Sequence, residues 1–292
     1  MDLIRLTKAV ETYVRTETPP VAVRLLESAG EIPERAKMPV RDFGVTMPLC
    51  QGMALARRHE MVVAMGADDM LCPLGAVATG LLPAKDGFLD GRFGIPYWVP
   101  DKESAARLLQ GMARLDHGKY AYIVMAPLER TTFEPDAIVV YGNPAQVGRM
   151  IQAVVHVTGE PVLSQAIGGT SCAEQIARTM LTGRCQSVLA GAGERMLALT
   201  QDHETSLALP SNMADAFAAA LDINDKLSDY WQWAPKGAGG AIVWKNRVPA
   251  AIGEIFERHG FIWGAKWYHF DTMHFEYRPE IIALAKQGWP KK

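Results

Sequence analysis

Tryptophan and cysteine are segregated along the chain, and their segregation divides it into two parts. Six of the seven tryptophans lie after residue 230, whereas all four cysteines lie before residue 186. A shift of composition this sharp indicates a domain boundary, and a chain of 292 residues is long enough for two ordinary domains. The sequence therefore predicts one domain over residues 1–212 and a second, smaller one over residues 213–292.

Bulk composition excludes several classes of protein. A hydrophobic content of 49% with 21% charged residues is typical of a globular chain, not a disordered one. The net charge of −2 gives no general attraction to nucleic acid or to acidic membranes. No apolar run approaches the roughly 20 residues that cross a bilayer, and the first residues lack the pattern of a signal peptide. The four cysteines form no C-x-x-C pair and suit reduced thiols, so we expect a cytoplasmic protein.

The first domain alternates amphipathic segments with short apolar runs. Residues 2–15 and 102–115 carry apolar side chains at helical spacing. Asn143 followed by Pro144 predicts a capped helix that ends at Gly159. Apolar runs predict strands at 21–26, 61–65, 120–125, 137–141, 186–189, 196–199 and 206–209. This mixture is typical of an α/β or α+β layer fold, and periodicity alone does not choose between the two.

Two segments of the first domain place a cysteine at the start of a helical pattern. Cys50 begins the pattern at 49–57, and Cys172 begins the one at 171–178. A thiol at a helix N-terminus feels the positive end of the macrodipole, which favours the thiolate. With Cys72, these residues are candidates for a redox, metal or anion site in one shared cleft. The alternative is that they pack as small apolar groups.

Residues 18–212 resemble an uncharacterised family, domain of unknown function 169. The resemblance is carried by Pro20-Val-Ala-Val-Arg-Leu-Leu26, the Cys50 helix and Cys72-Pro-Leu-Gly75, and by the stretch from Gly193-Glu-Arg195 to Thr200-Gln-Asp202. It implies a compact cytoplasmic domain with no assigned chemistry.

The second domain carries a stretch dense in aromatic residues over 261–279, with Asp271 three residues before His274. An Asp-x-x-His pair suits a hydrolytic zinc site, in which the imidazole binds the ion and the carboxylate takes a proton from the metal-bound water. The same histidine could equally be a packed, hydrogen-bonded residue of an aromatic strand. Around it, residues 248–260 predict a short helix, and residues 261–263 and 275–277 predict strands.

Residues 220–285 resemble the C-terminal part of the zinc D-alanyl-D-alanine carboxypeptidase and L-alanyl-D-glutamate endopeptidase family. The resemblance rests on the 261–279 stretch and on Asn246-Arg-Val-Pro249, Tyr230-Trp-Gln-Trp233 and Ala220-Leu-Asp-Ile-Asn224. It implies zinc, with Asp222 and His274 as ligands close to each other and Asp271 as general base. The first motif of that family, S-x-H-x-x-G-x-A-x-D, is reduced here to its last alanine and aspartate.

The place of the histidine ligand in that first motif is taken by Asp215. A carboxylate can bind zinc, so Asp215 is a candidate third ligand. However, Met213, Phe217 and Leu221 are spaced as on an amphipathic helix. Seven residues of helix rise about 10.5 Å, so on a helix Asp215 could not share an ion with Asp222. We expect the helix, with Asp215 solvated.

These patterns support three hypotheses. The first is an uncharacterised domain fused to a degenerate, inactive carboxypeptidase-like module with weakly bound zinc or none. The second is an active zinc peptidase that acts on cell-wall peptides, and the third is a cysteine-based metal- or anion-binding protein. About 70 residues are few for an independent core, so the first domain or a second copy of the chain would have to complete the module. A peptide is the ligand that such a module would take, and whether the chain is an enzyme stays open.

Overall fold

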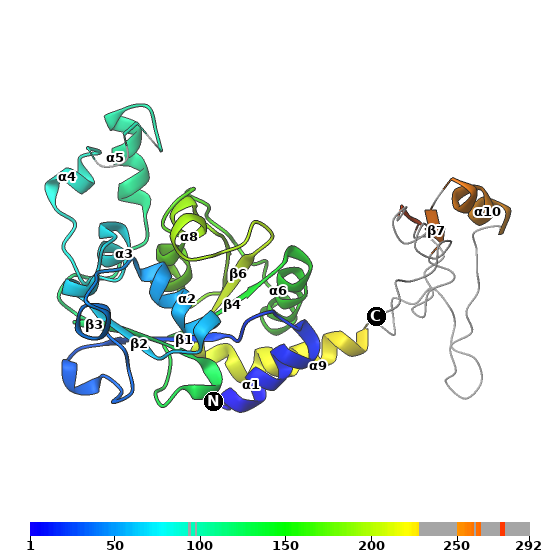
Figure 1. Cartoon of the computed structure of the whole chain (residues 1–292), viewed down its shortest axis with the longest axis horizontal. Helices are drawn as coiled ribbons and strands as arrows, with labels where there is room; N and C mark the ends of the chain where they lie inside the picture. Colours follow the sequence, from blue (N-terminus) through cyan, green and yellow to red (C-terminus); the bar gives the residue numbers. More distant parts are fainter. Residues whose placement is uncertain (93–94, 97, 228–249, 260, 264–274, 278–292) are drawn as a thin grey trace, which may run out of the picture. The chain divides into compact units, whose positions relative to one another are not determined.

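A computed structural model of the chain describes residues 1–92, 95–96, 98–227, 250–259, 261–263 and 275–277 (Figure 1). The chain divides into two compact units, Met1–Lys226 and Leu227–Lys292. The first unit therefore continues past residue 212 and includes most of helix α9 (Ala214–Leu227). None of the described helices is long and apolar enough to cross a membrane.

A six-stranded sheet forms the centre of the first unit, with the strand order β2-β3-β1-β4-β6-β5. Every neighbouring pair in it is antiparallel. Its strands are β1 (Val21–Leu26), β2 (Val63–Gly66), β3 (Tyr122–Pro127), β4 (Ala137–Gly142), β5 (Gln186–Leu189) and β6 (Thr205–Pro210). This pairing settles the fold class as α+β, because an α/β fold would have a mostly parallel sheet.

Helices cover both faces of the sheet, and side chains alternate between them along each strand. On one face, Val23 and Tyr141 pack with α2 (Leu49–His59), α3 (Pro73–Ala78) and the π-helix η6 (Ala173–Arg178). On the other face, Ile138 and Leu207 pack with α1 (Leu3–Ala9), the π-helix η1 (Val10–Val14), α6 (Pro144–Thr158) and α9. Figure 1 shows the two groups of helices on opposite sides of the central strands.

Other helical segments connect these elements. They are η2 (Ala29–Glu31), η3 (Pro39–Phe43), η4 (Ala67–Asp69), α4 (Asp86–Leu89), α5 (Lys102–Gly111), η5 (Leu128–Arg130), α7 (Thr179–Thr182), α8 (Ala192–Leu197) and η7 (Ser211–Met213). The strand predicted at 196–199 is wrong, because the chain there finishes helix α8 instead. Met196 is 80% exposed and Leu197 is 43% exposed, so this apolar run is not a buried strand.

Helix α6 has the caps that the sequence predicts. The Asn143 side chain accepts a hydrogen bond from the Gln146 backbone N–H at 2.9 Å, and the Gln146 side chain accepts one from the Asn143 N–H at 2.8 Å. Gly159 ends the helix with φ +68°, a conformation that costs glycine little.

The described part of the second unit contains a helix, α10 (Ala250–Arg258), and an antiparallel pair, β7 (Phe261–Trp263) with β8 (Phe275–Tyr277). Trp263 is buried against α10, where a Cβ on Gly253 would lie 2.5 Å from the indole ring. Phe256 and Phe261 form an edge-to-face pair with ring centroids 5.4 Å apart. The predicted helix beside two aromatic strands is confirmed.

Candidate functional site

Three cysteines gather where three helices of the first unit begin. Cys50 lies in the first turn of α2, Cys72 caps the start of α3, and Cys172 caps the start of η6. These helices pack on one another: a Cβ on Gly75 of α3 would lie 3.1 Å from the Leu49 Cβ and 3.7 Å from the Cys172 Sγ. The structure therefore brings together the three candidate thiols from segments far apart in the sequence.

The pKa values of Cys50 and Cys172 are shifted in the direction opposite to the one that their positions at helix starts suggest. Burial, together with the charges of Glu194 and Cys72, raises the pKa of the Cys50 thiol to about 12. Burial also raises the pKa of Cys172, as do Cys72, Cys50 and Glu194. Backbone N–H groups act in the other direction but are outweighed. Of the two alternatives, the shift toward thiolate is therefore wrong for Cys50 and Cys172, because desolvation exceeds the dipole effect, and both thiols are protonated at neutral pH.

The buried carboxylate beside the thiols belongs to Glu194 of helix α8. It is 4% exposed. The Tyr141 hydroxyl donates to its Oε1 at 2.6 Å, the Ser171 hydroxyl donates to its Oε2, and Thr200 lies at 3.5 Å. Ser171 directly precedes Cys172, so the contact fixes the carboxylate near that thiol. Within the part of the chain that the structure describes, Glu194 forms no ion pair.

Arg57 supplies the positive charge of this region, but it pairs with another glutamate. Its guanidinium contacts both carboxylate oxygens of Glu204, at 2.5 Å and 3.0 Å, with both side chains buried. It also lies 4.0 Å over the Tyr141 ring. Arg58 adds a contact to Glu204 at 2.8 Å. Burial raises the pKa of Glu204, but hydrogen bonds from Arg57 and from the Gln201 N–H, with the two arginine charges, lower it to about 2.

The sequence did not single out Glu194, Tyr141, Arg57 or Glu204 as site residues. Glu194 stands inside the Gly193-Glu-Arg195 stretch that carries the family resemblance, and this was its one signal. Tyr141 lies near the end of an apolar strand, and no sequence pattern marked its hydroxyl as part of a site.

The two candidate zinc ligands of the first motif both lie on helix α9, which confirms the predicted helix. Asp215 accepts a hydrogen bond from the Asp2 N–H at 2.7 Å and lies 3.5 Å from the terminal amino group, with its side chain 53% exposed. Asp222 accepts a hydrogen bond from the Tyr13 hydroxyl at 2.7 Å. Asp271 and His274 lie outside the described residues, so the predicted proximity of Asp222 and His274 stays a prediction.

The described donors do not fit the zinc site of the peptidase family. Asp215 and Asp222 are seven residues apart on one helix, and each contacts a different group near the N-terminus. Across all described residues, no three His, Cys, Asp or Glu side chains stand close enough to hold a metal ion in their present positions. The cysteine group is included in that statement, so an ion there would have to draw the sulfur atoms together.

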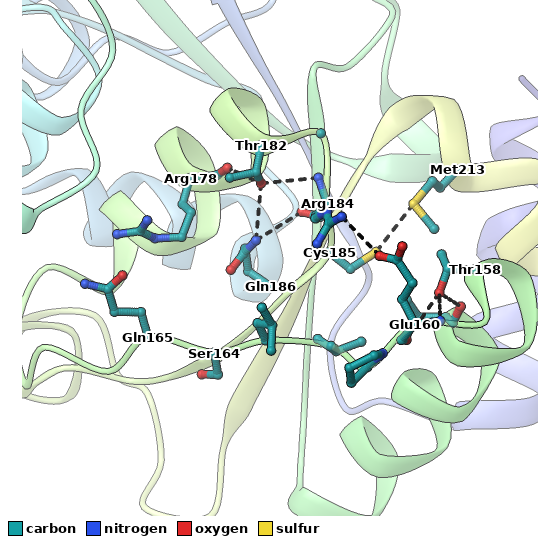
Figure 2. A pocket seen from close by; sticks show the side chains of 15 residues that line it. Thr158, Glu160, Ser164, Gln165, Arg178, Thr182, Arg184, Cys185, Gln186 and Met213 are labelled. Atoms are coloured by element: carbon teal, nitrogen blue, oxygen red, sulfur yellow. Dashed lines mark hydrogen bonds and ion pairs between the residues drawn. The ribbon is translucent and has the colours of Figure 1, made fainter.

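A separate cavity of about 770 Å³ opens beside the end of α6 (Figure 2). An ion pair between Arg184 and Glu160, at 3.2 Å, lies along its wall. Cys185 lines it and packs 3.7 Å from the Met213 sulfur, and burial raises its pKa to about 12. Cys185 is the thiol that lines this cavity, and it is protonated and stands apart from the other cysteines. The cavity is therefore less suited to chemistry than the three-cysteine group.

Comparison with known families covers both units. Residues 9–220 match the model of the uncharacterised ArCR family, domain of unknown function 169. The chain belongs to this family. An uncharacterised protein of Methanocaldococcus jannaschii is 27% identical over 221 residues, which cover 74% of this chain and 91% of that protein. Residues 214–277 match a D-alanyl-D-alanine carboxypeptidase model. No solved structure matches the chain. The first unit, Met1–Lys226, is therefore called the ArCR unit.

Proposed function

We propose that the ArCR unit binds a thiophilic metal ion through Cys50, Cys72 and Cys172. The observation that carries this proposal is the meeting of three cysteines from separate segments beside a buried carboxylate. Thiolate sulfur is the preferred ligand of soft and borderline ions such as zinc, which it binds at about 2.3 Å.

The electrostatics of the group favour a cation. The charge of Glu194 and the neighbouring thiols oppose ionisation of Cys50 and Cys172, and a cation among them would reverse that effect and displace the thiol protons. Cys185 provides the contrast, because burial alone raises its pKa and no other acidic group contributes. Cys185 thus has the environment of a cysteine that serves only in packing. A second thiol and a carboxylate, by contrast, act on the ionisation of Cys50 and Cys172.

The first prediction concerns metal binding. Purified protein should bind about one zinc ion per chain, and Cys50→Ala, Cys72→Ala and Cys172→Ala should each weaken binding more than about 100-fold, since lesser, outer-shell changes already cost about 10–100-fold. Competition with a chromophoric zinc chelator measures the affinity. Cys185→Ala is the matched control and should bind as the wild type does. Equal affinities in all four variants would contradict the proposal.

We also propose that the carboxypeptidase-like module has no working zinc site. The support is the engagement of Asp222 by Tyr13 and of Asp215 by the N-terminus, together with the loss of the histidine from the first motif. A zinc peptidase keeps three protein ligands and an open position for water. The competing function, a peptidase that acts on cell-wall peptides, has the family match of residues 214–277 in its favour.

The second prediction separates these two functions. With zinc added, the protein should release no D-alanine from a peptide ending in D-Ala-D-Ala, because the described first-motif groups cannot supply the missing ligand. Chromatographic detection of free D-alanine is the measurement, with Asp271→Asn as the paired variant. Hydrolysis by the wild type that this variant abolishes would establish the peptidase instead.

A further inference from the structure

The cavity beside the end of α6 has the size and the lining of a small-molecule pocket (Figure 2). Its volume of about 770 Å³ lies within the roughly 300–1,000 Å³ that such pockets span. Its apolar lining includes the buried Val154 and Cys185, together with Met213 and Leu163. Leu163 is 65% exposed, so it presents to water an apolar surface that a ligand would cover. The cavity shares no lining residue with the three-cysteine group, so what it binds does not depend on the metal proposal.

Gln186, on the edge strand β5, offers this cavity a hydrogen-bond acceptor. The residue is 5% exposed, and its Nε2 donates to the Arg184 carbonyl at 3.3 Å and to the Thr182 hydroxyl at 3.4 Å. Because a carbonyl oxygen only accepts, the end of the amide that faces it is the nitrogen. The Oε1 therefore turns away from both groups and into the cavity, and none of the described residues donates a hydrogen bond to it (Figure 2). A ligand N–H would satisfy this oxygen.

The charged side chains of the cavity are already paired. Arg178 contacts both carboxylate oxygens of Glu174, one through Nε and the other through Nη2 at 3.1 Å. Arg184 lies 3.2 Å from Glu160. A charged ligand would compete with one of these pairs and would also lose its own hydration, whereas a neutral ligand leaves both pairs intact.

Donor groups complement the acceptor of Gln186. A guanidinium carries five N–H groups, and Glu174 takes those of the Arg178 Nε and Nη2 that face it, which leaves Nη1 as a donor. Gln165 also lines the cavity, and its amide can both donate and accept. An acceptor and donors within one apolar cavity match a ligand that has an N–H and a carbonyl, which are the two groups of an amide.

We propose that this cavity binds a neutral small molecule in which an apolar body carries an amide group. The amide N–H donates to the Gln186 Oε1, and the amide carbonyl accepts from Arg178 or Gln165. The apolar body covers Leu163 and packs against Met213. The protonated thiol in the wall serves only in packing, so the ligand is bound without a covalent step.

Methyl NMR of the full-length protein, labelled with carbon-13 at its methionine methyl groups, tests this inference, because the Met213 methyl group lies in the lining. Naphthalene-2-carboxamide is the neutral probe, and 2-naphthoate and naphthalene-2-carboxamidine are its anionic and cationic counterparts. The amide should shift the Met213 signal saturably, with a dissociation constant on the order of 1 mM. Either charged probe should bind about 5-fold more weakly. Met196 of α8, which is 80% exposed and outside the cavity, is the internal control, and its signal should not move. Met213→Leu and Met196→Leu assign the two signals.

Gln186→Leu should weaken binding of the amide about 5–10-fold, as expected for one lost hydrogen bond, and should leave binding of 2-naphthoate unchanged. Gln152→Leu is the matched control, because Gln152 is an exposed glutamine of α6 that does not line the cavity. The N,N-dimethyl derivative of the amide has no N–H and tests the same hydrogen bond in the wild type. It should bind about 5–10-fold more weakly than the parent amide, whether or not Gln186→Leu folds.

Each contrary outcome removes a definite part of the proposal. No saturable shift of Met213 with any of the three charge-matched probes would overturn the binding site. Tighter binding of 2-naphthoate or of the amidine than of the amide would overturn the neutral ligand class. Equal affinities for the amide and its dimethyl derivative would overturn the hydrogen bond to Gln186. Equal shifts of Met196 and Met213 would show non-specific association with apolar surface, and would overturn the site as well.

Discussion

Replacing Arg57 with alanine should lower the free energy of unfolding of the ArCR unit by about 3–5 kcal/mol. The substitution leaves the buried carboxylate of Glu204 without its two-point contact, and it removes the cation over the Tyr141 ring. Glu204 would keep only the partly exposed Arg58 and the Gln201 N–H, and breaking a buried ion pair by removing one partner is among the most destabilising changes in a protein interior. Hydrogen exchange of the backbone amides in β4 and β6 reports the opening of this unit separately from the second one.

Arg58→Ala is the control for that measurement. Arg58 contacts the same carboxylate, but its side chain is 22% exposed, so its loss should cost no more than about 1 kcal/mol. If Arg57→Ala and Arg58→Ala reduce the exchange protection of β4 and β6 equally, then the buried Arg57–Glu204 pair stabilises the unit no more than the exposed contact does, which would contradict the prediction.

Replacing Phe217 with alanine should cost the same unit about 3–5 kcal/mol. Phe217 lies on helix α9 and is fully buried against the sheet face that also contains Ile138, Leu207 and Leu209. Truncating the ring leaves a cavity that the surrounding strands cannot close completely. The measurement is again exchange in β4 and β6, because loss of the ring should make the whole unit open more easily.

Ile223→Ala, on the same helix, is the matched control. Ile223 is 42% exposed, so its truncation should change stability by less than about 1 kcal/mol. If Phe217→Ala accelerates exchange only within α9 and leaves the strands unchanged, then the helix is an appendage and does not belong to the core of the ArCR unit.

Local features of the fold could be predicted from the sequence, and long-range ones could not. Asn143, Pro144 and Gly159 mark helix α6 because caps act through neighbouring residues. The choice between α/β and α+β depends on which strands pair, and pairing joins segments such as β1 and β3 that are far apart in the chain. Periodicity carries no information about such partners.

The candidate site shows the same division. The positions of Cys50 and Cys172 at helix starts follow from local pattern, but the direction of their pKa shifts depends on how deeply packing buries them. Glu194 was missed because a glutamate in a short helix usually faces solvent. Its burial depends on Tyr141, which comes from a distant strand. Asp222 likewise meets Tyr13, at the other end of the ArCR unit's sequence.

Helix α9 carries residues 214–220, where the two family matches overlap. Phe217 and Leu221 are committed to the sheet of the ArCR unit, while Ala220 and Asp222 are what is left of the peptidase motif. Truncating the chain before this helix would remove Phe217 and Leu221 from the ArCR core. Truncating it after the helix would separate the carboxypeptidase-like module from its own first motif. A segment that lies within the ArCR unit is thus also covered by the carboxypeptidase match, and the junction between the two cannot be moved in either direction without loss to one of them.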